Sequence, residues 1–88
     1  MASYKLRIKK SAAKELEAIS LKSDRQLVAK CIEALAEDPR PPGCKKLSGA
    51  ERYRVRQGSY RIVYAIEDEE PIVYVVKIGF RKSVYRGL

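Results

Sequence analysis

The first half of the chain changes from a two-residue to a helical hydrophobic period. Residues 3–9 alternate apolar and basic side chains, which predicts a strand with one buried face. Apolar residues then recur at helical spacing, first after Ser11 and again after Asp24, and both of these residue types are typical helix N-caps. The Pro-rich segment 38–43 ends the second helix, because proline lacks an amide proton and disfavours helix in the preceding residue. We therefore predict an N-terminal strand followed by a two-helix hairpin.

The second half of the chain returns to the two-residue period of strands. Turn residues separate the apolar runs, with tight connections at Gly58-Ser59 and at residues 68–70. Connections this short make consecutive strands antiparallel neighbours. The predicted strands are a short one at 44–47 and longer ones at 52–57, 60–67 and 71–80. We predict an α+β fold, with the two-helix hairpin packed on a twisted antiparallel sheet of about four strands, in one domain spanning residues 1–88.

Residue types that serve metal or cofactor chemistry are scarce. The chain has no histidine, which removes the usual general base and the commonest metal ligand. Cys31 lies on the apolar stripe of the second predicted helix and is interpreted as a core residue, and its spacing from Cys44 fits no metal site. The acidic run 67–70 favours a solvated hairpin tip, because adjacent carboxylates in a turn diverge. We expect no metal and no cofactor.

The charge balance gives the first indication of a partner. The chain carries a formal net charge of +8 and has a pI near 9.7. Such a balance suggests a polyanionic partner, and nucleic acid is favoured. No segment approaches the run of ~20 apolar residues that spans a bilayer, and the N-terminus lacks the apolar stretch of a secretion signal. We expect a cytoplasmic protein that does not bind membranes.

The basic residues concentrate around one predicted hairpin. Strand alternation places Tyr53 and Val55 on the face that the helices cover, and Arg54 and Arg56 on the opposite face. Burying the apolar side of the next strand turns Arg61 outward as well. Residues 45–61 contain six cations against the single carboxylate of Glu51, namely Lys45, Lys46, Arg52, Arg54, Arg56 and Arg61. Unpaired like charges cost stability unless a polyanion relieves them, so we predict an anion-binding face.

The C-terminal segment adds further residues of the same kind. It contains the cations Arg81, Lys82 and Arg86, with Tyr85 between the last two. Arginine and tyrosine both stack on unpaired bases, and arginine also binds phosphate through two parallel hydrogen bonds. This combination is typical of single-stranded RNA binding.

The sequence resembles the RelE/ParE toxin superfamily, and specifically its RelE-like messenger-RNA interferases. The most specific matches are the runs GSYRIVY at 58–64 and RKSVY at 81–85, and the resemblance covers nearly the whole chain. It implies a toxin of a type II toxin–antitoxin module, an endoribonuclease that cleaves mRNA in the ribosomal A site and so inhibits translation. It also implies a RelB-like antitoxin as partner, and operator DNA contacted through the antitoxin complex.

The resemblance also assigns roles to individual residues. Arg54 and Arg56 match two basic residues before the hairpin turn, although some relatives have lysines there, which could shuttle a proton more readily than arginine. Arg61, Arg81 and Tyr85 match the arginine after the turn and an arginine and tyrosine after the last strand. Attack of a ribose 2′-OH on the adjacent phosphate needs charge stabilisation and proton transfer. We therefore assign Arg61, Arg81 and Tyr85 as catalytic, and the predicted RNA-binding residues are Arg54, Arg56, Lys45, Lys46, Lys82 and Arg86.

Two points stay open at the level of sequence. Tyr85 either accepts the 2′-OH proton, with a pKa lowered by the surrounding cations, or only stacks on a base and orients it. The alternatives for function are a ParE-like inhibitor of DNA gyrase and a basic RNA-binding module without catalysis. Arg81 and Tyr85 count against the gyrase inhibitor, because ParE-like members generally lack this pair.

Overall fold

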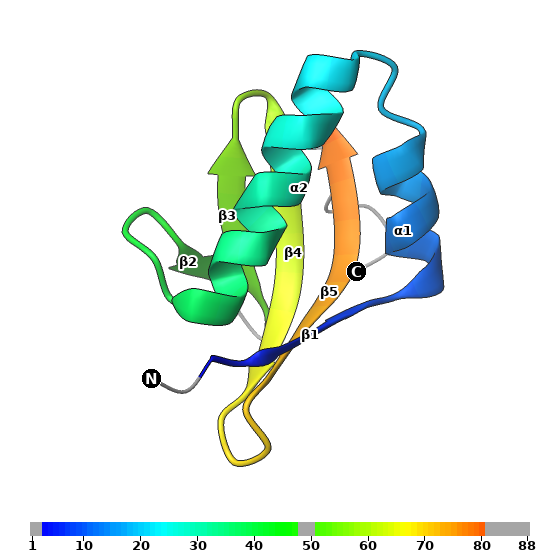
Figure 1. Ribbon diagram of the computed structural model, residues 1–88. Coiled ribbons are helices and arrows are strands. Elements are labelled where there is room, and N and C mark those ends of the chain that lie inside the picture. Colours follow the sequence, from blue (N-terminus) through cyan, green and yellow to red (C-terminus); the bar gives the residue numbers. More distant parts are fainter. Residues whose placement is uncertain (1–2, 48–50, 81–88) are drawn as a thin grey trace.

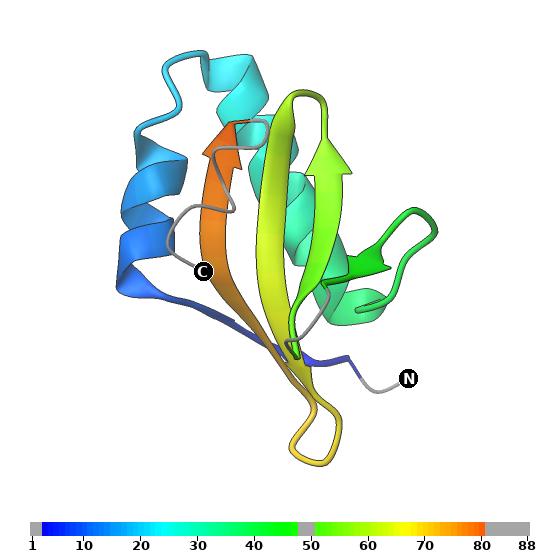
Figure 2. The ribbon, with the colours of Figure 1, turned by 180° about the vertical axis from the view of Figure 1, so that it is seen from behind.

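The computed structural model describes residues 3–47 and 51–80 as two helices packed on one face of a five-stranded sheet. Figure 1 shows α1 and α2 on the same side of the strands, and Figure 2 shows the opposite face, which neither α1 nor α2 covers. In the described part of the chain, neither helix has the length and apolarity needed to cross a membrane. The elements are β1 (Lys5–Ile8), α1 (Lys10–Glu17), α2 (Lys22–Glu37), β2 (Lys45–Lys46), β3 (Tyr53–Gln57), β4 (Tyr60–Glu67) and β5 (Ile72–Phe80).

The predicted α+β class is confirmed, with a difference in the sheet. Its strand order is β1-β5-β4-β3-β2, and β1 pairs with β5 in parallel, so the sheet is mixed rather than antiparallel. The rule for short turns decides the direction only of consecutive strands. The first and last strands are separated by both helices and by the other strands, and a connection of that length permits a parallel pair. The predicted strand at 44–47 is present as the two-residue β2.

The predicted helix caps are wrong. Lys9 and Leu21 occupy the N-cap positions of α1 and α2, and neither makes a capping hydrogen bond from its side chain. The backbone N–H of Lys9 donates to the carbonyl of Val75 at 2.8 Å, so the chain leaves the sheet and enters α1 directly. Asp24 lies in the first turn of α2, where a carboxylate interacts favourably with the positive end of the helix dipole.

The core forms between the helices and the inner face of the sheet, as the alternation predicts. Val55, Ile62 and Tyr64 are buried there, and Cys31 packs against the same cluster. Burial raises the pKa of the Cys31 thiol, as expected for a core cysteine. The other buried apolar residues of this cluster are Ala12, Ile19, Val28, Ile32, Leu35, Val73, Val75 and Ile78.

Helix α1 closes the part of the β5 edge that β1 leaves open. The carboxylate of Glu15 accepts the backbone N–H of Ile78 at 3.1 Å, and it forms an ion pair with the Nζ of Lys77 at 3.1 Å. An unpaired edge amide would cost free energy and would also expose the strand to pairing with other chains. A side chain therefore supplies the hydrogen bond that a neighbouring strand would supply.

A network at the other end of the molecule holds the Pro-rich segment against the β4–β5 hairpin. Tyr64 donates its hydroxyl proton to the carbonyl of Pro39 at 2.7 Å. Arg40 forms two hydrogen bonds to Asp68, and Tyr4 donates to the same carboxylate at 2.9 Å. The tip at 67–70 is exposed, as predicted, but Asp68 also anchors distant segments to it.

Candidate nucleic-acid interface

The helix-free face of the sheet carries the basic cluster that the sequence predicts. In the register of β3 and β4, Arg56 is the direct partner of Arg61, and Arg54 is the partner of Val63. Val55, which lies between the two β3 arginines, is part of the core, so Arg54 and Arg56 lie on the side away from the helices. Lys45 of β2 pairs with Arg54 and extends the cluster. We call this surface, defined by Lys45, Arg54, Arg56 and Arg61, the arginine face.

A tight turn brings two of these arginines together. Only Gly58 and Ser59 connect β3 with β4, and Gly58 has a φ of +61°. Glycine adopts this left-handed conformation without a steric penalty. The turn places Arg56 directly across from Arg61, and such cross-strand partners have Cβ atoms about 4.5–5.5 Å apart. The two cations therefore share one short stretch of the outer face, close enough to bind the same phosphate group.

The arginines differ in their exposure. Arg56 is exposed and Arg61 is half-buried, whereas Arg54 is only 8% exposed. The Nε atom of Arg54 is buried and has no hydrogen-bond partner among the described residues. Val63, its neighbour on β4, is fully buried but lies outside the core cluster beneath the helices. A cation removed from water interacts more strongly with an approaching anion, which favours Arg54 as a phosphate contact.

The remaining predicted residues divide into two groups. Lys46 pairs in register with Tyr53, whose ring stacks on that of Tyr64, and its Nζ forms an ion pair with Glu51 at 3.6 Å. The structure therefore does not bring Lys46 into the arginine face, and its predicted RNA contact stays a prediction. The predicted residues Arg81, Lys82, Tyr85 and Arg86 lie outside the described residues. The described chain ends at Phe80, directly after Gly79, the partner of Arg61.

Two cations extend this surface beyond the residues predicted for the site. Arg52 precedes β3, and Arg7 of β1 reaches the same face through the parallel pairing with Tyr74 of β5. The sequence signal for Arg52 was its place in the basic run. Arg7 gave no signal, because local patterns contain nothing about the pairing of β1 with β5.

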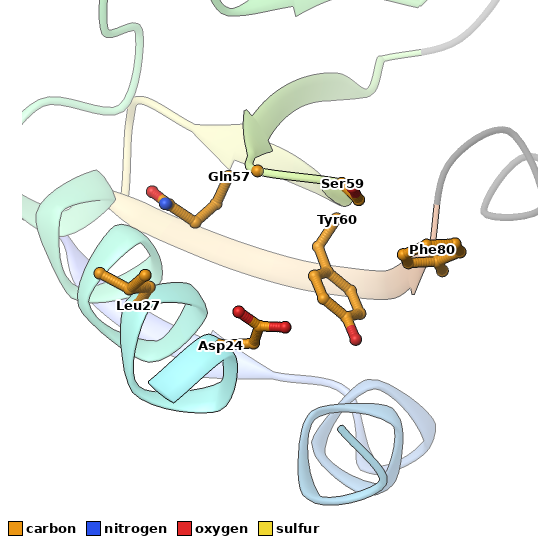
Figure 3. A pocket seen from close by; sticks show the side chains of 7 residues that line it. Asp24, Leu27, Gln57, Ser59, Tyr60 and Phe80 are labelled. Atoms are coloured by element: carbon orange, nitrogen blue, oxygen red, sulfur yellow. The ribbon is translucent and has the colours of Figure 1, made fainter. Parts of the chain in front are cut away.

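A separate pocket lies on the other side of the hairpin turn, beneath the start of α2. Its volume is about 240 Å³, and Figure 3 shows Asp24 and Tyr60 among the side chains that line it. Asp24 is the charged residue in its described lining. A negative charge at this position disfavours phosphate, so the arginine face is the better candidate for a polyanion.

The arginine face can bind phosphate and stabilise negative charge. Guanidinium groups donate paired hydrogen bonds to two phosphate oxygens. No carboxylate forms an ion pair with Arg54 or Arg56 within residues 3–47 and 51–80, so their charge remains available to a ligand. A preorganised cluster of donors of this kind stabilises the charge that develops when a phosphate ester is attacked.

Comparison with known proteins identifies the family. The family described as the ParE toxin of the type II toxin–antitoxin system, parDE, matches residues 6–85. Because this match covers most of the sequence, the chain belongs to the RelE/ParE superfamily of type II toxin–antitoxin toxins.

Relatives and solved structures agree with this assignment. The chain is 32% identical over 81 residues to the mRNA interferase toxin RelE of Escherichia coli K12, covering 90% of this chain and 84% of the relative. The RelE chain of the intact E. coli RelBE toxin–antitoxin complex superposes with a TM-score of 0.77 at 29% identity, over 91% of this chain and 99% of that one. The RelE–RelB complex of Pyrococcus horikoshii shows the same fold, with a TM-score of 0.80 at 24% identity, over 91% and 97% of the two chains.

Proposed function

We propose that this protein is the toxin of a type II toxin–antitoxin module and acts as an endoribonuclease that cleaves mRNA in the ribosomal A site. The observation that carries the proposal is the register pairing of Arg56 with Arg61 beside the desolvated Arg54, on the face that neither α1 nor α2 covers. The kinship with the E. coli mRNA interferase RelE supports the choice of RNA as substrate.

The proposed reaction is an internal transfer of the phosphate ester. The ribose 2′-OH attacks the adjacent phosphorus, a bond forms between O2′ and phosphorus, and the bond to the 5′ oxygen of the next nucleotide breaks. The 2′-OH gives up its proton, and the leaving 5′ oxygen gains one. Negative charge increases on the phosphate oxygens during attack, and Arg61 stabilises that charge, with Arg54 and Arg56 binding the ground state. Arg81 is assigned to the same charge stabilisation as Arg61, and Tyr85 to proton transfer or base orientation.

The residues available for proton transfer explain the proposed dependence on the ribosome. Without histidine, the chain lacks the side chain best suited to acid–base catalysis near neutral pH. Holding the nucleophile in line with the leaving group supplies a large part of the rate in such reactions. A ribosome that fixes the mRNA strand in a bent conformation provides this alignment, so free RNA is expected to be a poor substrate.

A RelB-like antitoxin is the proposed protein partner. The similar RelE chains of E. coli and P. horikoshii are both found in complexes with RelB. The net charge of +8 favours an antitoxin segment with acidic residues. Contact with operator DNA is proposed to occur through this complex. Co-expression of the neighbouring reading frame is therefore expected to relieve growth arrest, and persistent arrest would contradict the pairing.

A coupled translation reaction with mapping of mRNA 5′ ends tests the proposed cleavage. The wild-type protein is expected to produce new mRNA ends within codons. These ends should disappear or become much weaker in three variants, namely Arg61→Ala, Arg81→Ala and Tyr85→Phe. Lys30→Ala, which removes an exposed charge from α2, is the matched control and should cleave normally. Intact mRNA together with inhibited gyrase supercoiling would instead support the ParE-like alternative. Salt-sensitive RNA binding with neither effect would support a non-catalytic module.

A further inference from the structure

A shallow depression lies on the helix-free face, at the end of the sheet away from the Gly58 turn. Tyr74 of β5 is flanked in register by Ala65 of β4 and by Arg7 of β1, and Arg52 lies on the far side, next to β3. The depression has a volume of about 500 Å³, and its lining includes all four of these residues. A row across four adjacent strands thus combines one aromatic ring, one small side chain and two flanking guanidinium groups.

The ring of Tyr74 is presented to solvent. Its neighbours Val73 and Val75 are fully buried in the core, so strand alternation places Tyr74 on the outer face, where it is 39% exposed. Its hydroxyl makes no hydrogen bond to any residue in 3–47 or 51–80. Ala65 contributes only a methyl group beside the ring, which leaves space for a planar group to stack.

The depression is lined by two cations and two carboxylates. Glu51 and Glu67 also line it, but Glu51 is paired with Lys46, and Glu67 accepts the backbone N–H of Glu69 at 3.3 Å. Arg7 and Arg52 form no ion pair through their side chains with the described residues. Both carboxylates keep their charge, but within the described residues neither of them pairs with Arg7 or Arg52, so the two guanidinium groups can interact with a ligand.

The depression lies on the same side of the sheet as the arginine face, with the buried Val63 between them on β4. Ala65 lies four residues beyond Arg61 on the same strand and on the same side of it, which corresponds to about 13 Å along β4. An extended single strand of a few nucleotides spans this distance. Cationic groups occur at both ends of the path, with Arg56 and Arg61 at one end and Arg7 and Arg52 at the other.

We infer that this depression is a base-binding subsite for single-stranded RNA, in which a nucleobase stacks on Tyr74 and the flanking phosphates contact Arg7 and Arg52. An exposed aromatic ring between two guanidinium groups that form no ion pair with the described residues provides both interactions that single-stranded nucleic acids require. Stacking tolerates every base, so the subsite adds affinity and alignment without sequence preference. The inference rests on the proposed function only for the choice of RNA as ligand.

Binding of oligoribonucleotides with 2′-O-methyl groups tests the subsite without cleavage, because the blocked 2′ oxygen cannot attack. Fluorescence anisotropy compares a short oligonucleotide of about four residues with a longer one of about eight, within the range of sites on small binding domains. Tyr74→Thr removes the ring but keeps a β-branched residue suited to a strand, and Tyr74→Phe keeps the ring. Leu27→Ala, on exposed α2 surface, is the matched control.

The wild-type protein is expected to bind the longer oligonucleotide more tightly than the short one. Tyr74→Thr should weaken binding of the longer oligonucleotide by about 5- to 150-fold, since one base stack contributes about 1–3 kcal/mol. Tyr74→Thr should bind the short oligonucleotide as tightly as the wild-type protein does. Tyr74→Phe and Leu27→Ala should bind both oligonucleotides with wild-type affinity. Arg7→Ala and Arg52→Ala should each reduce the slope of log affinity against log salt concentration by about 0.7.

Several outcomes would overturn the inference. Equal affinity of the wild-type protein for both lengths would do so, as would wild-type binding by Tyr74→Thr or an equal loss in Tyr74→Phe. Loss of antitoxin binding in Tyr74→Thr, with RNA affinity unchanged, would assign the depression to a protein partner instead. A length-dependent stack on Tyr74 in a protein that cuts no mRNA would refute the proposed cleavage and support the subsite. Normal cleavage of mRNA, together with no effect of Tyr74→Thr on RNA binding, would support the proposed cleavage and refute the subsite.

Discussion

The two faces of the sheet are built from alternate residues of the same strands, but they differ in almost every physical property. On the inner face, Ile62 and Tyr64 are fully buried beneath the helices and contribute to the core. On the outer face, which neither α1 nor α2 covers, Arg56 and Arg61 are direct partners in register. Residues one position apart in sequence therefore belong to different regions, one of which stabilises the fold while the other is the proposed ligand-binding surface.

The difference between the faces implies that stability depends mainly on the inner face and the proposed activity mainly on the outer face. Burial of apolar area stabilises the inner face, whereas the like charges of the outer face repel one another, and a bound anion would offset that repulsion. Substitutions on the two faces should consequently change different measured quantities, even at adjacent positions of β4.

The largest expected effect is the loss of stability caused by a cavity in the inner face. Ile62→Ala removes a fully buried side chain and should lower the free energy of unfolding by about 2–5 kcal/mol, because it leaves a cavity in the core. Urea denaturation followed by circular dichroism measures this change. Leu27→Ala, at an exposed apolar position of α2, is the control and should cost far less. Equal costs for the two variants would contradict the assignment of Ile62 to the core.

The neighbouring residue on the opposite face should show the reverse pattern. Arg61→Ala should reduce the rate of mRNA cleavage by about 10²–10³-fold, because one preorganised charge-stabilising donor is lost. Its unfolding midpoint in urea should stay close to that of the wild-type protein. The measurement pairs the rate of appearance of cleaved mRNA in a translation reaction with a denaturation curve. A large loss of stability with normal cleavage would reverse the proposed roles of the two faces.

Arg54 is the sharpest test of the comparison, because it is a buried residue of the outer face. Arg54→Met replaces the guanidinium with an apolar side chain and should leave stability unchanged or raise it, since a desolvated cation is removed. RNA affinity should fall about tenfold through loss of a charged contact. Lower stability and unchanged affinity would show that Arg54 is structural. Arg56→Met, at the exposed neighbouring position, is the matched control for stability.

The smallest expected effect concerns the network that ties the hairpin tip to both N-terminal and Pro-rich segments. The hydrogen bond from Arg40 has the largest lowering effect on the pKa of Asp68, and the hydrogen bond from Tyr4 lowers it further. A carboxylate with a depressed pKa stabilises the folded state above about pH 4, its unfolded value, and this contribution disappears as the pH falls through the folded pKa. Asp68→Asn should therefore show a smaller loss of stability on acidification than the wild-type protein in denaturation curves.

The acid sensitivity of two variants at the hairpin tip tests the contribution of Asp68. An identical dependence on pH in the wild-type and Asp68→Asn proteins would show that the network does not contribute to stability. Glu70→Gln removes a carboxylate from the same exposed tip without touching the contacts of Arg40, and its acid sensitivity should match the wild type.

The central part of the candidate site was predictable from the sequence because it depends on local geometry. Strand alternation and a two-residue turn suffice to place Arg54, Arg56 and Arg61 on one face, and the register of β3 and β4 confirms that arrangement. Patterns could not predict that Arg54 would be buried, because burial depends on what surrounds a side chain. They also grouped Lys46 with the cluster, whereas its register places it opposite Tyr53.

Local sequence patterns were enough to predict the elements, the inner and outer positions of each strand and the position of the basic residues around the hairpin. These properties follow from periodicity and turn chemistry, which act over a few residues. The parallel pairing of β1 with β5, the direct start of α1 after the sheet and the pairing of Arg7 with Tyr74 became visible only in the folded structure. Each of these depends on contacts between residues far apart in the chain, and no local pattern encodes which distant edge a strand will join.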